Sequence, residues 1–140
     1  IDLPDNFYNI KEAHVSKATF YRLYLSSLFQ NDNKNLIYLD ADIICTQDPK
    51  NELFSAMHKM NNNNQSAAFA DELSRSEYEE PFLRLGMSSD SYFNAGVMIF
   101  NLKKWNENDY STKAISLVDS LREKAKFWDQ DVLNAMFDGN

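Results

Sequence analysis

The sequence has little glycine, proline or cysteine, with three, three and one among its 140 residues. So few glycines and prolines exclude collagen-like and linker-dominated chains, which depend on these two residues. The single cysteine, Cys45, excludes a disulfide within the chain, and no spacing of cysteine and histidine is typical of a zinc site. The chain also has no apolar run close to the roughly 20 residues that a membrane-spanning helix needs.

Positive charge is scarce as well, because 14 Lys and Arg stand against 21 Asp and Glu and give a net charge of −7. An acidic surface repels phosphate backbones, so we expect no nucleic-acid partner. Hydrophobic residues (44%) and charged residues (25%) are present in the proportions of an ordinary folded protein. The length fits one domain with a sizeable core.

Short apolar runs alternate with amphipathic segments along the chain. The candidate strands cover residues 36–39, 66–70 and 95–100, and the unbroken apolar run over residues 36–39 is typical of a strand buried on both faces in a parallel sheet. Segments with helical spacing of apolar positions cover residues 16–30, the stretch that begins at Asp48-Pro49, and residues 114–125 and 129–136. This alternation predicts an α/β domain with a mostly parallel sheet flanked by helices.

Two aspartates follow the first apolar run and flank one small residue, in the order Asp40-Ala41-Asp42. In extended backbone alternate side chains point the same way, so these carboxylates can converge. Two carboxylates so close repel each other unless a cation lies between them, and oxygen ligands suit Mg²⁺ or Mn²⁺. Open α/β sheets also bind ligands beyond the carboxyl ends of their strands. The pattern favours a divalent-cation site, and the alternative is a solvated aspartate pair in a loop.

Asn94-Ala95-Gly96 precedes the last apolar run. Small residues at this position allow a ligand or another backbone to approach closely. The amide of Asn94 offers both a donor and an acceptor, which suits sugar hydroxyls. The alternative is an ordinary turn before a core strand.

Two further features have both a structural and a functional interpretation. Asp129-Gln130-Asp131 begins the last helix, where an N-cap explains Asp129 but leaves Gln130 and Asp131 without a required role. Arg22 lies within an otherwise apolar helical stretch. It either extends its charge into solvent or binds an anionic group such as a diphosphate.

Four motifs, taken in chain order, resemble those of glycosyltransferase family 8. This family of retaining nucleotide-sugar glycosyltransferases includes bacterial lipopolysaccharide glucosyl- and galactosyltransferases and glycogenin. The motifs are Ala18-Thr19-Phe20-Tyr21-Arg22-Leu23, Ile37-Tyr38-Leu39-Asp40-Ala41-Asp42-Ile43, Phe93-Asn94-Ala95-Gly96-Val97-Met98 and Asp129-Gln130-Asp131-Val132-Leu133-Asn134. The resemblance covers the chain from about residue 14 onward.

The resemblance implies a GT-A fold, a Rossmann-like α/β sandwich that binds a UDP-sugar together with Mn²⁺ or Mg²⁺. It implies transfer of a hexose, glucose or galactose, with retention to a glycan acceptor such as lipopolysaccharide. Asp40 and Asp42 are the implied metal ligands, and Asp129 and Gln130 are the implied catalytic residues near the anomeric carbon. The positions implied to bind the donor are Arg22, Asp40, Ala41, Asp42, Asp71, Asn94, Ala95, Asp129 and Gln130.

The family pattern also has parts that this chain does not contain. Its first strand, which binds uracil and ribose, would precede Ile1, and a histidine motif with a further metal ligand would follow Asn140. We therefore expect residues 1–140 to be the central part of a single GT-A domain, incomplete at both ends and poorly active alone. We expect a cytoplasmic protein that associates with the inner membrane only through segments outside this chain.

Two other functions remain open at this point. Haloacid-dehalogenase-like phosphatases also place Asp-x-Asp after a buried strand, but they need a threonine two residues past the second aspartate. Here Ile44 occupies that position and Thr46 comes too late. The other alternative is a non-catalytic fragment that binds a nucleotide sugar, although all four motifs are intact.

Overall fold

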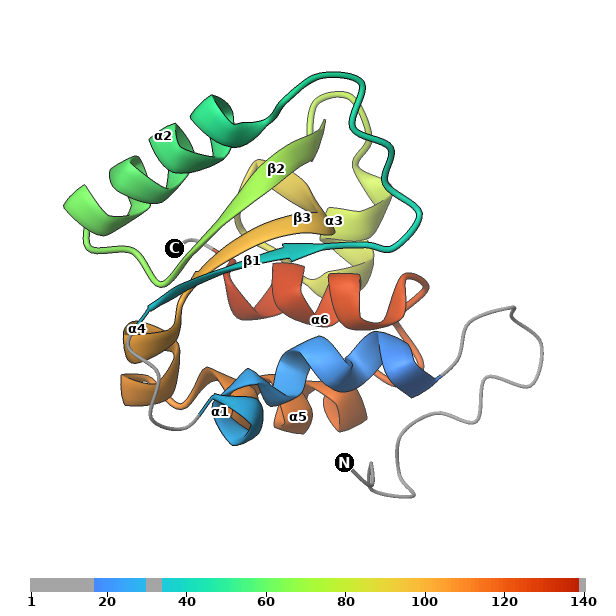
Figure 1. Ribbon diagram of the computed structural model, residues 1–140. Coiled ribbons are helices and arrows are strands. Elements are labelled where there is room, and N and C mark those ends of the chain that lie inside the picture. Colours follow the sequence, from blue (N-terminus) through green and yellow to red (C-terminus); the bar gives the residue numbers. More distant parts are fainter. Residues whose placement is uncertain (1–16, 30–33, 139–140) are drawn as a thin grey trace.

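The computed structural model describes residues 17–29 and 34–138, which form a three-stranded sheet with helices on both faces (Figure 1). In chain order the elements are the 3₁₀ helix η1 (Lys17–Tyr24), α1 (Leu25–Leu28), β1 (Asn35–Leu39), α2 (Lys50–Asn62), β2 (Ala67–Ser74), α3 (Glu80–Leu85), β3 (Ser91–Asn101), α4 (Leu102–Glu107), α5 (Tyr110–Ser120) and α6 (Trp128–Met136). Each predicted strand and helix is present. The segment predicted as one helix over residues 16–30 is mostly a 3₁₀ helix in its described part.

Residues that favour helix ends lie at the boundaries of α2 and α3. Before α2, the side chain of Asp48 accepts a hydrogen bond from the backbone N–H of Lys50 at 3.0 Å, and Pro49 is the N-cap residue. Pro81 lies in the first turn of α3, and Gly86 ends that helix with a left-handed φ of 71°. Glycine adopts this conformation without the steric cost that a Cβ would bring.

The sheet has the strand order β1-β3-β2, and β3 runs antiparallel to both neighbours. The predicted mostly parallel sheet is therefore wrong for the described strands. β1 and β2 do run in the same direction and are connected through α2, but β3 lies between them. Ser91 at the start of β3 pairs with Ser74 at the end of β2, so the chain between them returns to the same end of the sheet. An apolar run indicates that a strand is buried and carries no information on its direction.

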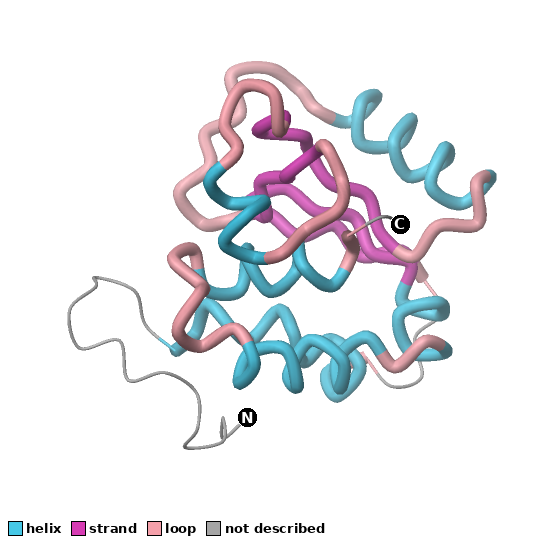
Figure 2. The backbone as a smooth tube through the Cα atoms, turned by 180° about the vertical axis from the view of Figure 1, so that it is seen from behind, coloured by secondary structure: helices cyan, strands magenta, loops and turns pink. Residues whose placement is uncertain are grey.

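The core lies between the sheet and α6, and η1, α1 and α5 form a further helical layer beyond α6 (Figures 1 and 2). β3 is the central strand, and Met98 and Phe100 are fully buried on it. Trp105 of α4 packs edge-on against Phe100, with ring centroids 4.9 Å apart. Each of these side chains contributes about 1.5–3 kcal/mol through its burial. On the other face of the sheet, α2 packs against β2 and β3 and buries Met60.

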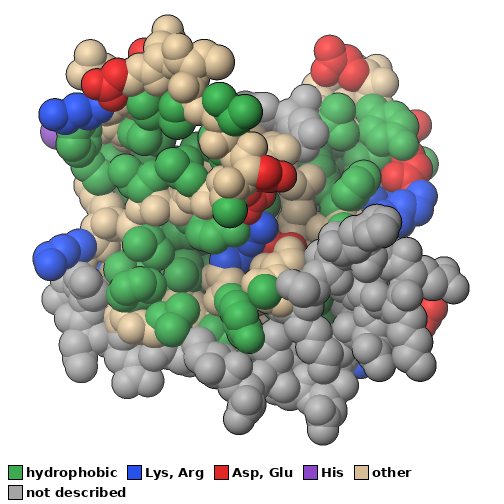
Figure 3. Space-filling model, turned by 45° about the vertical axis from the view of Figure 1, so that its right-hand side comes forward, with side chains coloured by type: hydrophobic (Ala, Val, Ile, Leu, Met, Phe, Trp, Pro, Cys, Tyr) green, Lys and Arg blue, Asp and Glu red, His purple; other side chains and the backbone are tan. Residues whose placement is uncertain are grey.

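β1 is an edge strand in the described structure, and only one of its faces is covered. Leu36 and Tyr38 pack against the core, whereas Ile37 and Leu39 on the opposite face are 38% and 43% exposed. The expectation of a strand buried on both faces is therefore wrong for β1, because α2 packs mainly against β2 and β3. Figure 3 shows one side of the molecule on which hydrophobic side chains lie exposed around a small group of charged ones. Over residues 17–29 and 34–138, none of the helices combines the length and the hydropathy needed to cross a membrane.

Candidate active site

The first part of the candidate site is the turn that follows β1. The backbone N–H of Asp40 donates to the carbonyl of Gly96 at 2.9 Å, so pairing with β3 continues to this residue. The N–H of Ile43 then donates to the carbonyl of Asp40 at 3.2 Å, which closes a turn over residues 40–43. Ala41 and Asp42 lie exposed on this turn. The extended backbone that we expected through Asp42 is therefore wrong, because the chain turns directly after Asp40.

Arg22 of η1 reaches across the core to this turn. Its Nη2 lies 3.3 Å from Oδ1 of Asp40, and its guanidinium lies 4.4 Å from the ring centroid of Tyr38. Its Nη1 donates to the carbonyl of Ala95, and its Nε lies 2.5 Å from Oδ2 of Asp129. Only 8% of the Arg22 side chain is exposed, so its charge does not extend into bulk solvent. This cation joins β1, β3 and α6.

Asp129 lies in the first turn of α6 and is 2% exposed. The hydroxyl of Thr19 donates to its Oδ1, and Arg22 faces its Oδ2. Burial raises the pKa of Asp129 above its ordinary value, and the positive charge of Arg22 opposes this shift. The N-cap alternative for Asp129 is wrong, because the N-cap residue of α6 is Phe127.

The segment around Gly96 brings Asn94 and Gln130 to the same place. Oδ1 of Asn94 accepts from the N–H of Gly96 at 2.7 Å, and Oε1 of Gln130 accepts from the N–H of Ala95 at 3.0 Å. A Cβ on Gly96 would lie 2.9 Å from Oδ1 of Asn94 and 3.1 Å from Oδ2 of Asp40. The absence of a side chain at Gly96 therefore allows the Asn94 amide and the Asp40 carboxylate to lie close together.

The structure thus gathers residues from four separate segments at one end of the sheet. The convergent residues are Arg22, Asp40, Asn94, Ala95, Asp129 and Gln130. Asp42 lies on the adjoining turn. Asp71 pairs with Phe93 in the sheet, so its backbone lies on the strand beside Asn94, and its side chain is outside the described part of the structure. The binding and catalytic roles of all these residues stay predictions.

The sequence did not single out Tyr38 as part of this site. Its hydroxyl donates to Oδ1 of Asp40 at 2.7 Å, and its ring lies against Arg22. Burial, together with the hydrogen bond to Asp40, raises the pKa of Tyr38 to about 12, so its hydroxyl remains a donor at neutral pH. The two-residue period of a strand was the signal that could have found it, since Tyr38 and Asp40 lie two positions apart.

The described part of the chain contains no group of three or more His, Cys, Asp or Glu side chains that could hold a metal ion. Oδ1 of Asp40 already accepts from Tyr38 and Arg22. The oxygens that fit a divalent cation are therefore Oδ2 of Asp40 and the exposed carboxylate of Asp42. Two carboxylates are fewer than the six ligands that Mg²⁺ or Mn²⁺ takes, so other groups must complete such a site.

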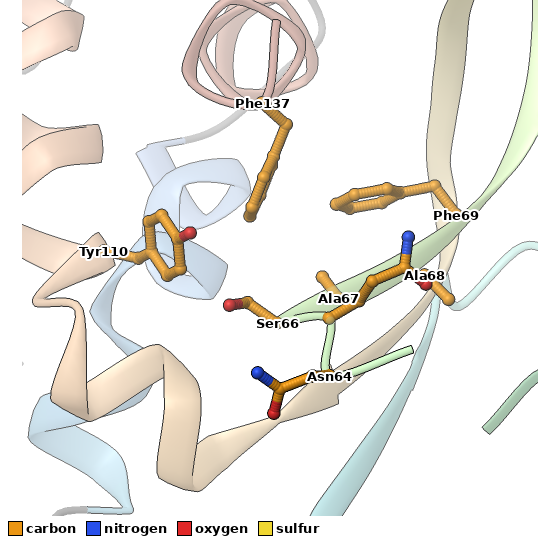
Figure 4. Close-up of a pocket in the computed structure, with 8 residues that line it drawn as sticks. Asn64, Ser66, Ala67, Ala68, Phe69, Tyr110 and Phe137 are labelled. Carbon is orange, nitrogen blue, oxygen red and sulfur yellow. The ribbon is translucent and has the colours of Figure 1, made fainter. Parts of the chain in front are cut away.

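A separate pocket of about 460 Å³ lies beside the first residues of β2 (Figure 4). The rings of Phe69, Tyr110 and Phe137 face it together with the hydroxyl of Ser66. Its remaining lining residues are Asn64, Gln65, Ala67 and Ala68. None of the convergent residues lines this pocket.

Known proteins with similar sequences include glycosyltransferases. The model of glycosyl transferase family 8 matches residues 5–140. The chain is 33% identical over 129 residues to the lipopolysaccharide 1,2-glucosyltransferase of Escherichia coli K12, an alignment that covers 89% of this chain and 36% of that protein. It is 29% identical over 127 residues to the glycosyltransferase GlyE of Streptococcus pneumoniae, covering 91% of this chain and 26% of GlyE.

Among solved structures, the galactosyltransferase LgtC in complex with donor and acceptor sugar analogues superimposes with a TM-score of 0.75. The two chains are 27% identical, and the match covers 94% of this chain and 45% of LgtC. The fold is that of the GT-A glycosyltransferases. The chain belongs to glycosyl transferase family 8, and it spans less than half the length of the relatives named here. The predicted family and GT-A fold are confirmed.

Proposed function

We propose that this chain provides the donor-sugar site of a retaining hexosyltransferase. The whole protein would move glucose or galactose from a UDP-sugar to a glycan acceptor such as lipopolysaccharide. The observation that carries the proposal is the convergence of one cation, Arg22, with two carboxylates, Asp40 and Asp129, and two amides, Asn94 and Gln130. A diphosphate needs positive charge, and a hexose needs several fixed hydrogen-bond partners. The names of the relatives, a lipopolysaccharide glucosyltransferase and a galactosyltransferase, support the same reaction class.

In this proposal the exposed turn after β1 holds the diphosphate. Asp42 and Oδ2 of Asp40 would hold Mn²⁺ or Mg²⁺, which supplies Lewis-acid stabilisation of the negative charge that grows on the leaving UDP. The Arg22 guanidinium keeps Asp40 in a single orientation, because it contacts Oδ1 and leaves Oδ2 facing Gly96. Arg22 therefore orients the metal-binding carboxylate in addition to any contact with the donor itself.

The hexose would lie between the turn and the first turn of α6. The anomeric carbon becomes oxocarbenium-like as its bond to UDP breaks, and a carboxylate or an amide oxygen near it stabilises that charge. We assign this role to Asp129 and to the carbonyl of Gln130. Asn94 would bind sugar hydroxyls, and Asp71 on the neighbouring strand would add an acidic group near the sugar.

We further propose that the reaction takes place in the cytoplasm and that the whole protein attaches to the inner membrane through segments outside this chain. The similarity to a lipopolysaccharide 1,2-glucosyltransferase supports this proposal. Residues 1–140 would then be the central part of one GT-A domain, since they match less than half of each relative named above.

An assay of UDP release by the whole protein tests the proposal. UDP-glucose and UDP-galactose are each supplied with Mn²⁺ or with a chelator, with and without a lipopolysaccharide acceptor. We expect UDP release that needs the metal and rises with the acceptor. Equal release in the presence of chelator would contradict the role of the metal. Binding of UDP without any transfer would instead show the non-catalytic alternative.

A further inference from the structure

Asp131, the third residue of the Asp-Gln-Asp motif, is buried beside the candidate site and does not line it. Its side chain is completely buried. Oδ1 accepts from the hydroxyl of Tyr92 at 2.7 Å. Oδ2 accepts from Nη1 of Arg84 at 2.7 Å, from the N–H of Lys126 at 2.7 Å and from the N–H of Phe127 at 2.9 Å. Four donors occupy both oxygens of this carboxylate and fix its position.

The backbone that Asp131 holds is strained. Trp128, directly after the two residues whose N–H groups bind Oδ2, has a φ of 41°. A bulky residue is strained in this left-handed region and persists there only where neighbouring contacts hold it. Asp129 and Gln130 are the next two residues of the chain. The direction in which their side chains leave α6 therefore depends on the turn that Asp131 holds.

Tyr92 connects Asp131 to Gln130. Burial raises the pKa of Tyr92 well above its ordinary value, and its single proton is donated to Asp131. The tyrosine oxygen must then accept its other hydrogen bond, and it does so from Nε2 of Gln130 at 3.1 Å. The Gln130 carbonyl consequently faces the other way, where Oε1 accepts from the N–H of Ala95 at 3.0 Å. The charge of Asp131 thus determines which end of the Gln130 amide faces the candidate site.

We propose that Asp131 is a positioning residue for the transfer reaction. It holds the strained turn before α6 and, through Tyr92, the amide orientation of Gln130, so that Asp129 and Gln130 are presented to the donor sugar. Asp131 itself does not touch the donor. This inference rests on the function proposed above.

The test uses Asp131→Asn and Tyr92→Phe in the whole protein. Tyr92→Phe keeps the buried ring and removes only the hydroxyl that links Asp131 to Gln130. We expect kcat to fall on the order of 10²-fold while the KM for the UDP-sugar stays within about threefold, because a misdirected group costs rate more than binding. We also expect the NMR signal of the Gln130 side-chain NH₂ to shift in both variants.

Asp138→Asn is the matched control. Asp138 is a carboxylate that also accepts from two backbone N–H groups, those of Ser88 at 2.7 Å and Ser89 at 2.8 Å, outside the candidate site. This control should lose stability and keep both kcat and the Gln130 signal. If Asp131→Asn and Tyr92→Phe also lose only stability, with kcat and the Gln130 signal unchanged, Asp131 is merely structural and the proposal is wrong. If Asp131→Asn does not fold, Tyr92→Phe alone decides.

The two proposals fail in different ways. A wild-type protein that does not turn over a UDP-sugar would overturn the proposed function. The Gln130 signal would then still decide whether Asp131 and Tyr92 orient this amide. A signal that stays unchanged in Tyr92→Phe overturns the positioning role whatever the activity of the wild type.

Discussion

Arg22 and Asp129 form a buried ion pair, with Nε of the arginine 2.5 Å from Oδ2 of the aspartate and only 8% and 3% of the side chains exposed. A buried ion pair is weak evidence for stability, because removing both charges from water costs about as much as their attraction returns. The same guanidinium also contacts Asp40 at 3.3 Å. One cation therefore links the carboxylate that we assign to the metal with the carboxylate that we assign to the sugar.

Replacing the shared cation should destabilise the protein strongly. In Arg22→Gln, the buried carboxylate of Asp129 loses its counter-charge, and we expect the free energy of unfolding to fall by about 3 kcal/mol in urea titrations at pH 7. Arg122→Gln is the control, since Arg122 pairs with Asp119 at 3.0 Å on the surface and should cost less than about 1 kcal/mol. Equal losses in the two variants would show that the Arg22 pair behaves like an exposed one.

Adding a methyl group at Gly96 should damage binding more than folding. A Cβ there meets Oδ1 of Asn94 at 2.9 Å and Oδ2 of Asp40 at 3.1 Å, so both side chains must shift. We expect Gly96→Ala to weaken binding of UDP-sugar, measured by calorimetry.

Gly86→Ala is the control for that variant. A Cβ at Gly86 meets nothing within 4 Å, but its φ of 71° makes alanine unfavourable by about 1 kcal/mol. This control should lower stability without changing binding. If Gly96→Ala binds the donor as the wild type does, Asn94 and Asp40 do not contribute to the site through their present positions.

Asp138 should stabilise the fold only above acidic pH. Burial alone would raise its pKa, but hydrogen bonds from Ser88 and Ser89 lower it to about 2, below the ordinary value of 3.8. A lowered folded-state pKa contributes stability above the unfolded-state value, and this contribution is lost as the pH falls toward 2. The free-energy difference between wild type and Asp138→Asn should therefore be largest near pH 6 and shrink steadily as the pH falls from about 4 to 2, as followed by urea unfolding. A difference that does not depend on pH would contradict the shift.

Asp129 should have the opposite effect on how stability depends on pH. Burial raises its pKa above 3.8, so the folded state retains the proton to a higher pH than the unfolded state does. From about pH 4 upward, the free energy of unfolding of the wild type should therefore decrease relative to that of Asp129→Asn. Urea titrations of both proteins between pH 4 and 7 measure this slope. An increasing difference would mean that Arg22 outweighs burial at this carboxylate.

The sequence was sufficient to locate the strands and helices but not to predict how they are arranged in space. Apolar periodicity located β3 and α6, because both bury a regular set of side chains. Apolar periodicity does not depend on the direction of a strand, so the antiparallel position of β3 between β1 and β2 could not be predicted from it. The same limit applies to the exposed face of β1, which depends on where α2 packs.

For the candidate site, the motifs located the residues but not their contacts. Arg22 and Asp129 are far apart in the chain, and only the packing of η1 against α6 brings them together. The two-residue period of an extended strand does not show where the strand ends, so it predicts extended backbone through Asp42, two residues beyond the start of the turn at Asp40. Asp131 lies in a recognised motif, but its complete burial and its four donors follow only from the folded turn before α6.

Calorimetric titration of the whole protein with UDP-glucose and UDP-galactose, in Mn²⁺ and in chelator, tests the central claim most directly. The comparison is between the wild type, Asp42→Asn and the exposed control Asp119→Asn. We predict saturable binding that needs the metal and is weakened about tenfold or more, or about 1.4 kcal/mol, in Asp42→Asn alone. The stability of Asp42→Asn should equal that of the wild type, since Asp42 is exposed. Wild-type binding that is as tight in chelator as in Mn²⁺, or binding by Asp42→Asn that is as tight as that of the wild type in Mn²⁺, would contradict a metal-dependent donor site at the end of β1.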